Sequence, residues 1–333
     1  MSENYTISLE GLMDVNATSY FLIAIQLTYG IPSLIMLIFC FCLIAVGSKY
    51  VSSFYTLVLF DLFTVKNFCV YLNTWIAIRI EMVSQWYFII ETIESILPGS
   101  ITWCKYMSFW FFHMHFWTSE LLTLHRLSSI LTWYHYDRVS EQCHYCVTYC
   151  ELKFWSKKLP VGCAIALVCI LSHIPNYFWN GFLYEIHIED GVLMCIVFPQ
   201  NVIIAFNVVG VFSTVYFSLN LVVGITTAVL SKTVQNGSAS YIKVSKKLTR
   251  ISLTYSFVYA FEVIWSVVNS VNHYFEFLPN LFWKRIKTNL LVISSDVFTL
   301  SLPFILLIYD SNVRKDVFRR KQQSIAGTAA AMS

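Results

Sequence analysis

Charged residues are scarce in this chain. Asp, Glu, Lys and Arg together make up 12% of its 333 residues, whereas hydrophobic residues make up 57%. Soluble domains carry roughly 25% charged residues, so this composition excludes an ordinary soluble protein. The formal net charge of +3 is too small to favour nucleic acid as a partner.

Glycine is also rare, and the motifs of common enzymes are missing. The sequence has 11 glycines and contains no glycine-rich phosphate loop, no HExxH metal motif and no nucleophile elbow. These absences exclude the common nucleotide-binding, metalloprotease and hydrolase sites. We therefore expect a protein that is not an enzyme and that has no cofactor.

Long apolar runs are abundant instead. Each is about long enough to cross a bilayer, because a spanning helix needs ~20 residues at about 1.5 Å each. The seven runs are Tyr20–Val46, Phe54–Ile78, Ile101–Thr132, Leu159–Asn180, Phe198–Leu230, Ile251–Phe275 and Thr288–Tyr309. They predict an all-α integral membrane protein, with an N-terminal segment (1–19), a seven-helix transmembrane domain (20–309) and a C-terminal tail (310–333).

The placement of positive charge predicts the orientation. With the N-terminus outside and the C-terminus in the cytoplasm, 16 of the 22 Lys and Arg residues lie on the inner side and five on the outer side. Cytoplasmic loops are enriched in Lys and Arg, so this orientation is favoured. The sequons that begin at Asn4 and Asn16 would then face the lumen, and we expect glycans there.

The same orientation sorts the cysteines by compartment. Cys104 and Cys195 lie on the oxidising side, so we expect them to form a disulfide that tethers the second outer loop to the third helix. On the reducing inner side, the segment Cys143–Cys150 has a spacing that suits zinc. Free or palmitoylated thiols are favoured there, and no metal site is expected.

Ionisable residues inside spanning segments are costly, so they mark packing or functional sites. The set comprises Asp61 and Lys66 in the second segment, His113, His115 and Glu120 in the third, Glu262 in the sixth and Asp296 in the seventh. Lys66 is one cation near three acids at similar depth, so we expect it to pair with at least one of them inside the bundle. Asp61 lies nearer the cytoplasm and is interpreted as a packing or switching residue.

His113, Trp117 and Glu120 recur at i, i+4 and i+7 and therefore share one face of the third segment. That face either lines a ligand cavity or forms a buried polar network that fixes helix packing. Trp265 in the sixth segment belongs to a set of outer-half tryptophans, of which a minority can line a pocket.

Arg126 lies near the inner end of the third segment. It either holds the helices together until a cytoplasmic partner binds, or it is an interfacial cation of the kind that any helix end carries. The context LTLHRLSSIL, with His125 just before it, favours the first interpretation.

Three motifs resemble those of the nematode serpentine receptor class gamma chemoreceptors. They are Tyr29–Ser33, Tyr71–Trp75 (which contains Asn73) followed by Arg79, and Leu122–Ile130. The resemblance implies a G-protein-coupled chemosensory receptor for small molecules, including pheromones, in the plasma membrane of sensory neurons and their cilia. It places Arg126 where the family has its arginine, although His125 stands where that family tends to have Asn. Asn73 joins the intramembrane ligand candidates.

The expected partners are a small-molecule ligand, a heterotrimeric G protein and the lipid bilayer. A seven-helix ligand-gated channel is the first alternative, and it would place the N-terminus inside. A transporter is the second alternative, although the sequence shows no internal repeat of the kind that transporters often have.

Overall fold

The computed structural model describes residues 5–8, 17–50, 52–79, 92–138, 158–178, 184–189, 192–233, 239–275 and 280–317. This part of the chain is almost entirely helical. Its long helices are α1 (Ala17–Val46), α2 (Ser53–Arg79), α4 (Ser100–Arg138), α6 (Lys158–Leu171), α7 (Pro199–Thr233), α8 (Ala239–Phe275) and α9 (Asn280–Tyr309). Every predicted apolar run coincides with one of these helices to within a few residues at one end or both.

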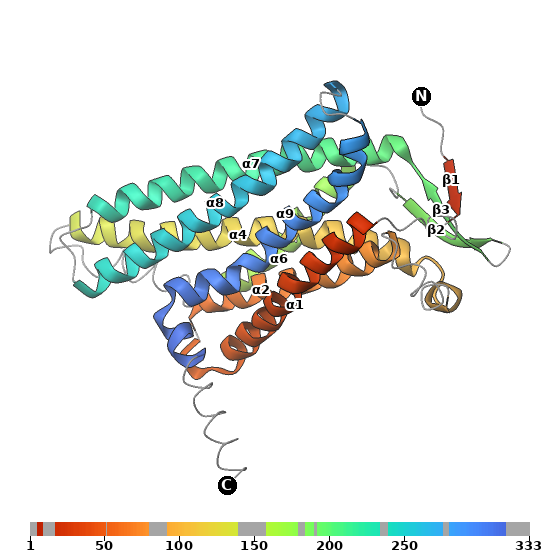
Figure 1. Ribbon diagram of the computed structural model, residues 1–333. Helices are drawn as coiled ribbons and strands as arrows, with labels where there is room; N and C mark the ends of the chain where they lie inside the picture. Colours follow the sequence, from red (N-terminus) through yellow and green to blue (C-terminus); the bar gives the residue numbers. More distant parts are fainter. Residues whose placement is uncertain are drawn as a thin grey trace, which may run out of the picture.

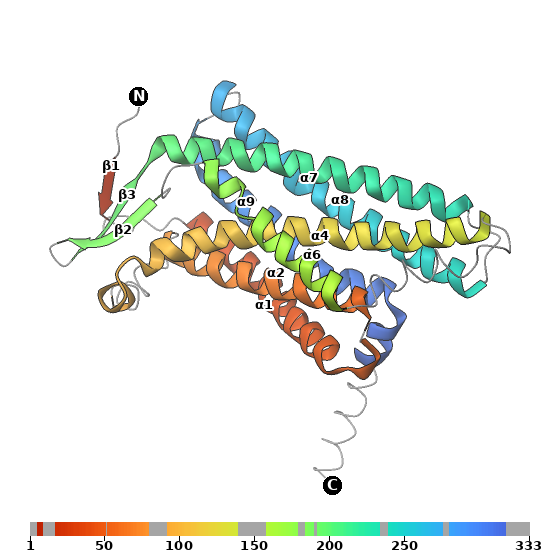
Figure 2. The ribbon, with the colours of Figure 1, turned by 180° about the vertical axis from the view of Figure 1, so that it is seen from behind.

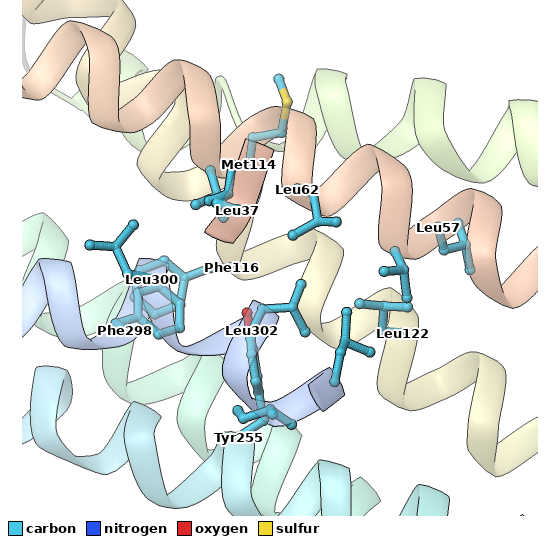
Figure 3. Close-up of a cluster of buried hydrophobic side chains, with 14 of the residues drawn as sticks. Leu37, Leu57, Leu62, Met114, Phe116, Leu122, Tyr255, Phe298, Leu300 and Leu302 are labelled. Carbon is cyan, nitrogen blue, oxygen red and sulfur yellow. The ribbon is translucent and has the colours of Figure 1, made fainter. Parts of the chain in front are cut away.

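The helices lie side by side in one bundle (Figures 1 and 2). The central helix is α4, which contacts α2, α6, α7 and α8, while α9 contacts α1, α2 and α8. The core between them is built from fully buried side chains such as Leu37, Leu57, Leu62 and Phe298 (Figure 3). Outward-facing positions are apolar as well: Ile35, Val222 and Phe257 are 62%, 62% and 80% exposed. Apolar side chains on both faces are typical of helices that face lipid.

Some of these helices are apolar enough to cross a membrane by length and composition alone. Within the described part of the chain, they are Thr28–Val46, Leu159–Phe178 and Ile203–Leu230. A fourth is obtained if Asp296–Tyr309 and Ser311–Val317, which meet at 93°, form one bent span. The other helices carry polar residues, such as Asp61 and Glu262, that face the bundle interior.

Helices α4, α7 and α8 continue beyond the predicted runs at the C-terminal ends of α4 and α7 and the N-terminal end of α8. The residues from Ala239 to Arg250, which lie before the predicted run Ile251–Phe275, form the first turns of α8. Hydropathy identifies only the part of a helix that can lie in lipid. The helix itself can continue past that part into water, because its backbone hydrogen bonds do not depend on apolar side chains. The three helices therefore project together at one end of the bundle (Figure 1).

The fourth predicted helix is shorter than expected. Helix α6 ends at Leu171, and after a turn Pro175–Phe178 forms the 3₁₀ helix η3. Pro175 has no N–H to donate to a carbonyl of the preceding turn, so the α-helix cannot continue through it.

A glycine turn and a buried carboxylate stabilise the start of helix α4. Gly99 has a φ of 82°, a left-handed conformation that favours glycine. The buried Glu94 carboxylate accepts hydrogen bonds from the Gly99 N–H and, at 3.3 Å, from the Ser100 hydroxyl. A carboxylate at this end also complements the positive end of the helix dipole.

A small antiparallel sheet, which hydropathy did not predict, lies at one end of the bundle (Figure 1). Its strands are β1 (Tyr5–Ser8), β2 (Tyr184–Glu189) and β3 (Val192–Val197), in the order β1-β3-β2. Ile7 and Ile186 both pair with Cys195. The sheet joins the N-terminal segment to the loop between η3 and α7, and β2 also contacts α4.

At the other end, the segment Ser311–Val317 folds back beneath the bundle. The Asp310 carboxylate caps it by accepting hydrogen bonds from the backbone N–H groups of Asn312 and Val313, at 2.9 and 3.4 Å. The hydroxyls of Tyr50 and Tyr55 donate to Asp316 and Asp310, each at 2.9 Å. Burial and the hydrogen bond to Asp316 raise the pKa of Tyr50, so this tyrosine remains protonated and able to donate.

Candidate functional site

Asp61 of α2 is fully buried and joins three helices. Its Oδ1 accepts a hydrogen bond from Nδ1 of His115 on α4 at 2.7 Å, and another from the Thr118 hydroxyl. Tyr255 of α8 donates to Asp61 Oδ2 at 3.4 Å, and its hydroxyl lies 3.2 Å from His115 Nε2. All four side chains are at most 5% exposed. We call this group the Asp61 network, and it fixes α2, α4 and α8 against one another.

A second network connects α4, α7 and α8 through Asn220. The Asn220 Nδ2 donates to Ser119 Oγ at 3.2 Å, and its Oδ1 accepts from the hydroxyls of Ser256 at 3.0 Å and Thr123 at 3.5 Å. All four side chains are buried. Because the polar groups of this network satisfy one another, they serve packing rather than recognition.

Phe116 lies at the point where four helices meet. Its ring centroid is 4.5 Å from that of Tyr259 on α8, 4.8 Å from Phe298 on α9 and 5.1 Å from Tyr216 on α7. Figure 3 shows Phe116 beside Phe298 in the core. Phe116 is 0% exposed, and these edge-to-face and stacked contacts are favourable aromatic geometries.

Several buried polar atoms around Phe116 have no hydrogen-bond partner in the described part of the structure. Among them are both ring nitrogens of His113, Ser213 Oγ, Glu120 Oε1 and the Tyr259 hydroxyl. The four residues, which we call the unpaired cluster, are 0–3% exposed and come from α4, α7 and α8. Buried polar groups in proteins are nearly always paired with protein atoms, ordered water or a ligand. The unpaired cluster is therefore the candidate site for a ligand.

The predicted face of α4 points toward α7. The ring of His113 lies 6.1 Å from Phe212 and 6.3 Å from Tyr216, and the Trp117 ring lies 5.2 Å from Tyr216. At about 1.5 Å of rise per residue, His113, Ser213 and Tyr259 lie about 20–24 Å from the start of α4, the start of α7 and the end of α8, respectively. These three residues thus lie at a similar depth, and Glu120 lies seven residues farther along α4, about 10 Å deeper.

The predicted pairing of Lys66 is wrong. The Lys66 side chain is exposed on the outer face of α2. The acids expected to pair with it are buried elsewhere: Asp296 accepts a hydrogen bond from the Tyr29 hydroxyl at 2.8 Å, joining α1 to α9. Glu262 is 0% exposed on α8, near Ser294 of α9. Trp265, one turn farther out on α8, is partly buried.

His125 and Arg126, the residues predicted to act in G-protein coupling, lie where the C-terminal third of α4 begins. His125 is 7% exposed, and its Nε2 lies 2.9 Å from the Ser53 hydroxyl at the start of α2. His125 therefore packs inside the bundle. The side chains of Arg126 and Asn73 lie outside the described residues, although their backbones belong to α4 and α2.

Cys104 is a free, partly buried thiol in this structure, so the predicted disulfide with Cys195 is not present there. The side chain of Cys195, within β3, is outside the described residues. The same holds for the predicted glycosylation sites Asn4 and Asn16 and for the segment Cys143–Cys150.

Sequence reasoning missed the residues that complete the buried networks. The hydroxyl groups of Tyr29 and Tyr255 bind Asp296 and Asp61 on other helices, and only the fold brings these partners together. Asn220 could have been identified from the sequence as a packing residue. An amide in the middle of an apolar helix is costly unless it pairs with a polar group on a neighbouring helix. His115 was recognised as an intramembrane ionisable residue, but its partner was not.

Comparisons with known proteins agree with this architecture. A family model described as "Srg family chemoreceptor" matches residues 23–317. The chain is 30% identical, over 98% of each sequence, to "Serpentine receptor class gamma-47" of Caenorhabditis elegans. It is 22% identical, over 87% of this chain and 88% of the relative, to "Serpentine receptor class gamma-53" of the same organism. A polytopic helical bundle whose sequence matches this family almost from end to end belongs to the Srg family of serpentine chemoreceptors.

Proposed function

We propose that this chain is a plasma-membrane chemosensory receptor that binds an extracellular small molecule and activates a heterotrimeric G protein. Seven helices would cross the membrane, with the N-terminus outside. The unpaired cluster is the observation that carries the proposal, because its buried donors and acceptors have no partner among the described residues. Membership of a chemoreceptor family supports the same conclusion.

Binding at the unpaired cluster would change the packing of α4, α7 and α8. His113 and Glu120 lie on α4, the helix that carries His125 and Arg126 at its inner end. The α4 residues of the Asp61 network and the Asn220 network lie between His113 and His125, and both networks contact α8. A ligand that favours one arrangement of these contacts would shift the equilibrium between two states of the bundle. The inner ends of α4, α7 and α8 would then bind the G protein.

The test is G-protein dissociation in cells that express the chain, challenged with fractionated nematode small-molecule secretions. We expect wild type to respond and Arg126→Glu to give no response at a matched surface level. In His113→Phe, which keeps a planar ring but removes both nitrogens, we expect about a tenfold loss of potency, the effect of roughly 1.4 kcal/mol of lost hydrogen bonding.

Tyr177→Phe is the matched control, because it removes a hydroxyl from a side chain that is 88% exposed. It should respond as wild type does. Unchanged potency in His113→Phe would exclude the unpaired cluster as the ligand site. A ligand-evoked current without G-protein dissociation would instead support the channel, and ligand accumulation in vesicles would support a transporter.

The proposed orientation makes a separate prediction about the outer surface. We expect Asn4 or Asn16 to carry a glycan, and Cys104 and Cys195 to form a disulfide once the chain reaches the oxidising lumen. Treatment with a glycosidase should increase gel mobility, and Asn4→Gln/Asn16→Gln should remove that shift. Labelling of Cys104 by a thiol reagent should require prior reduction. An unglycosylated chain whose N-terminus is labelled only after permeabilisation would contradict this orientation.

A further inference from the structure

Lys66 occupies the midpoint of α2 and faces away from the bundle. It is thirteen residues from each end of the helix, Ser53 and Arg79, or about 20 Å along the axis in each direction. Leu57, Leu62 and Val65 are at most 1% exposed and face the core. Lys66 follows Phe63, which is 43% exposed, on the outer face of the helix.

No carboxylate in the described part of this chain reaches Lys66. The four acids of the spanning helices, Asp61, Glu120, Glu262 and Asp296, are 0–5% exposed and point into the bundle. Asp61 is five residues before Lys66 on the same helix and is occupied by His115, Thr118 and Tyr255. An opposite charge that pairs with the Lys66 ammonium group therefore has to come from another molecule.

The helix next to α2 exposes apolar side chains. On the neighbouring helix α1, Ile31, Ile35 and Ile38 are 52%, 62% and 44% exposed. The hydrocarbon layer extends ~15 Å on each side of the bilayer midplane. A lysine side chain extends ~6 Å, so the ammonium group cannot reach the lipid headgroups without thinning of the bilayer.

We propose that the outer face of α2 around Lys66 binds a membrane-spanning helix of a different protein, one that carries an Asp or Glu at mid-membrane depth. A charge in hydrocarbon is satisfied by an opposite charge at the same depth. A second copy of this chain does not supply that charge, because its carboxylates in the described spanning helices are buried. The proposal rests on the membrane crossing of α2 that is part of the proposed function, and it does not depend on ligand binding or on G-protein coupling.

The test uses the full-length receptor in lipid vesicles and a designed leucine-rich spanning peptide as the probe. Energy transfer between labelled receptor and labelled peptide is measured for peptides with Glu or Gln at the centre. We expect at least threefold more association with the Glu peptide than with the Gln peptide. Moving the Glu by two turns toward one end of the peptide should remove the preference.

Lys66→Leu and Lys66→Arg are the matched variants. Because Lys66 is outside the core, Lys66→Leu should reach the surface and unfold at the temperature of wild type, and it should bind the two peptides equally. Lys66→Arg should keep the preference for Glu. Equal binding of both peptides by wild type, or a preference for Glu that persists in Lys66→Leu, would overturn the proposal. The glycosylation test described above reports independently on whether the chain spans the membrane as proposed.

Discussion

Replacing Asp61 by alanine is expected to destabilise the folded bundle by roughly 3–5 kcal/mol and to remove most of the protein from the cell surface. The variant would leave the Nδ1 of His115 and the hydroxyl of Thr118 without their acceptor, in a place that water does not reach. Each buried donor left unpaired costs about 1–3 kcal/mol. Tyr255 would lose its hydrogen bond to Asp61 Oδ2.

Asp61→Asn is the control, because the amide keeps the shape and one acceptor oxygen. We expect it to lose clearly less stability than Asp61→Ala. Thermal unfolding of purified protein in detergent is the measurement, with surface labelling in cells as the second readout. In the double variant Asp61→Ala/Tyr255→Phe, the losses should be less than additive, because both changes break the same network. Unfolding of Asp61→Ala at the wild-type temperature would show that the network does not support the fold.

The second large effect is expected for Phe116→Ala, which should lose about 3–5 kcal/mol of stability. Phe116 is fully buried, and its ring contacts α7, α8 and α9 through Tyr216, Tyr259 and Phe298. Alanine would leave a cavity where four helices meet, and close-packed interiors relax only partly around such a cavity.

Phe116→Leu should lose less than Phe116→Ala, because leucine fills most of the space. Phe257→Ala is the position control: Phe257 is 80% exposed, so its removal should change stability by at most about 0.5 kcal/mol. The midpoint of thermal unfolding in detergent measures all three variants. Similar losses in Phe116→Ala and Phe257→Ala would show that the aromatic core is not packed as the structure has it.

Much of the bundle could be predicted because apolar length is a local property of the sequence. Each of the long helices coincides with a run that hydropathy identifies, but the fourth run was predicted to be helical through Pro175, whereas α6 ends at Leu171. The extension of α8 back to Ala239 was not predictable from hydropathy, since those turns lie beyond the apolar run. The partner of β1 is distant in the sequence and could not be predicted. The pairing of β2 with β3 was overlooked, although the two residues between them are Asp-Gly, a common hairpin signal.

The partners of the intramembrane residues depend on helix rotation, which apolar length does not specify. Asp61 and Lys66 are five residues apart on α2, and at about 100° per residue they lie ~140° apart around the axis. Both cannot face the interior. The sequence therefore shows that only one of the two residues can face the interior. Asp61 faces it because His115 and Tyr255 bind its carboxylate there, and only the packing of the helices brings these residues together. The face shared by His113, Trp117 and Glu120 was predictable because it depends on one helix alone.

The pairing of β1 with β3 has a consequence for the order of events during synthesis. Ile7 pairs with Cys195, and helices α1, α2, α4 and α6 lie between them in the chain. Strand β1 is therefore synthesised first, and it can pair with β3 only after those four helices have been synthesised. In the proposed orientation, Asn4, immediately before β1, meets the oligosaccharide-transferring enzyme during that interval. Attachment of a glycan would thus precede closure of the sheet, and the outer surface would reach its final arrangement late in biogenesis.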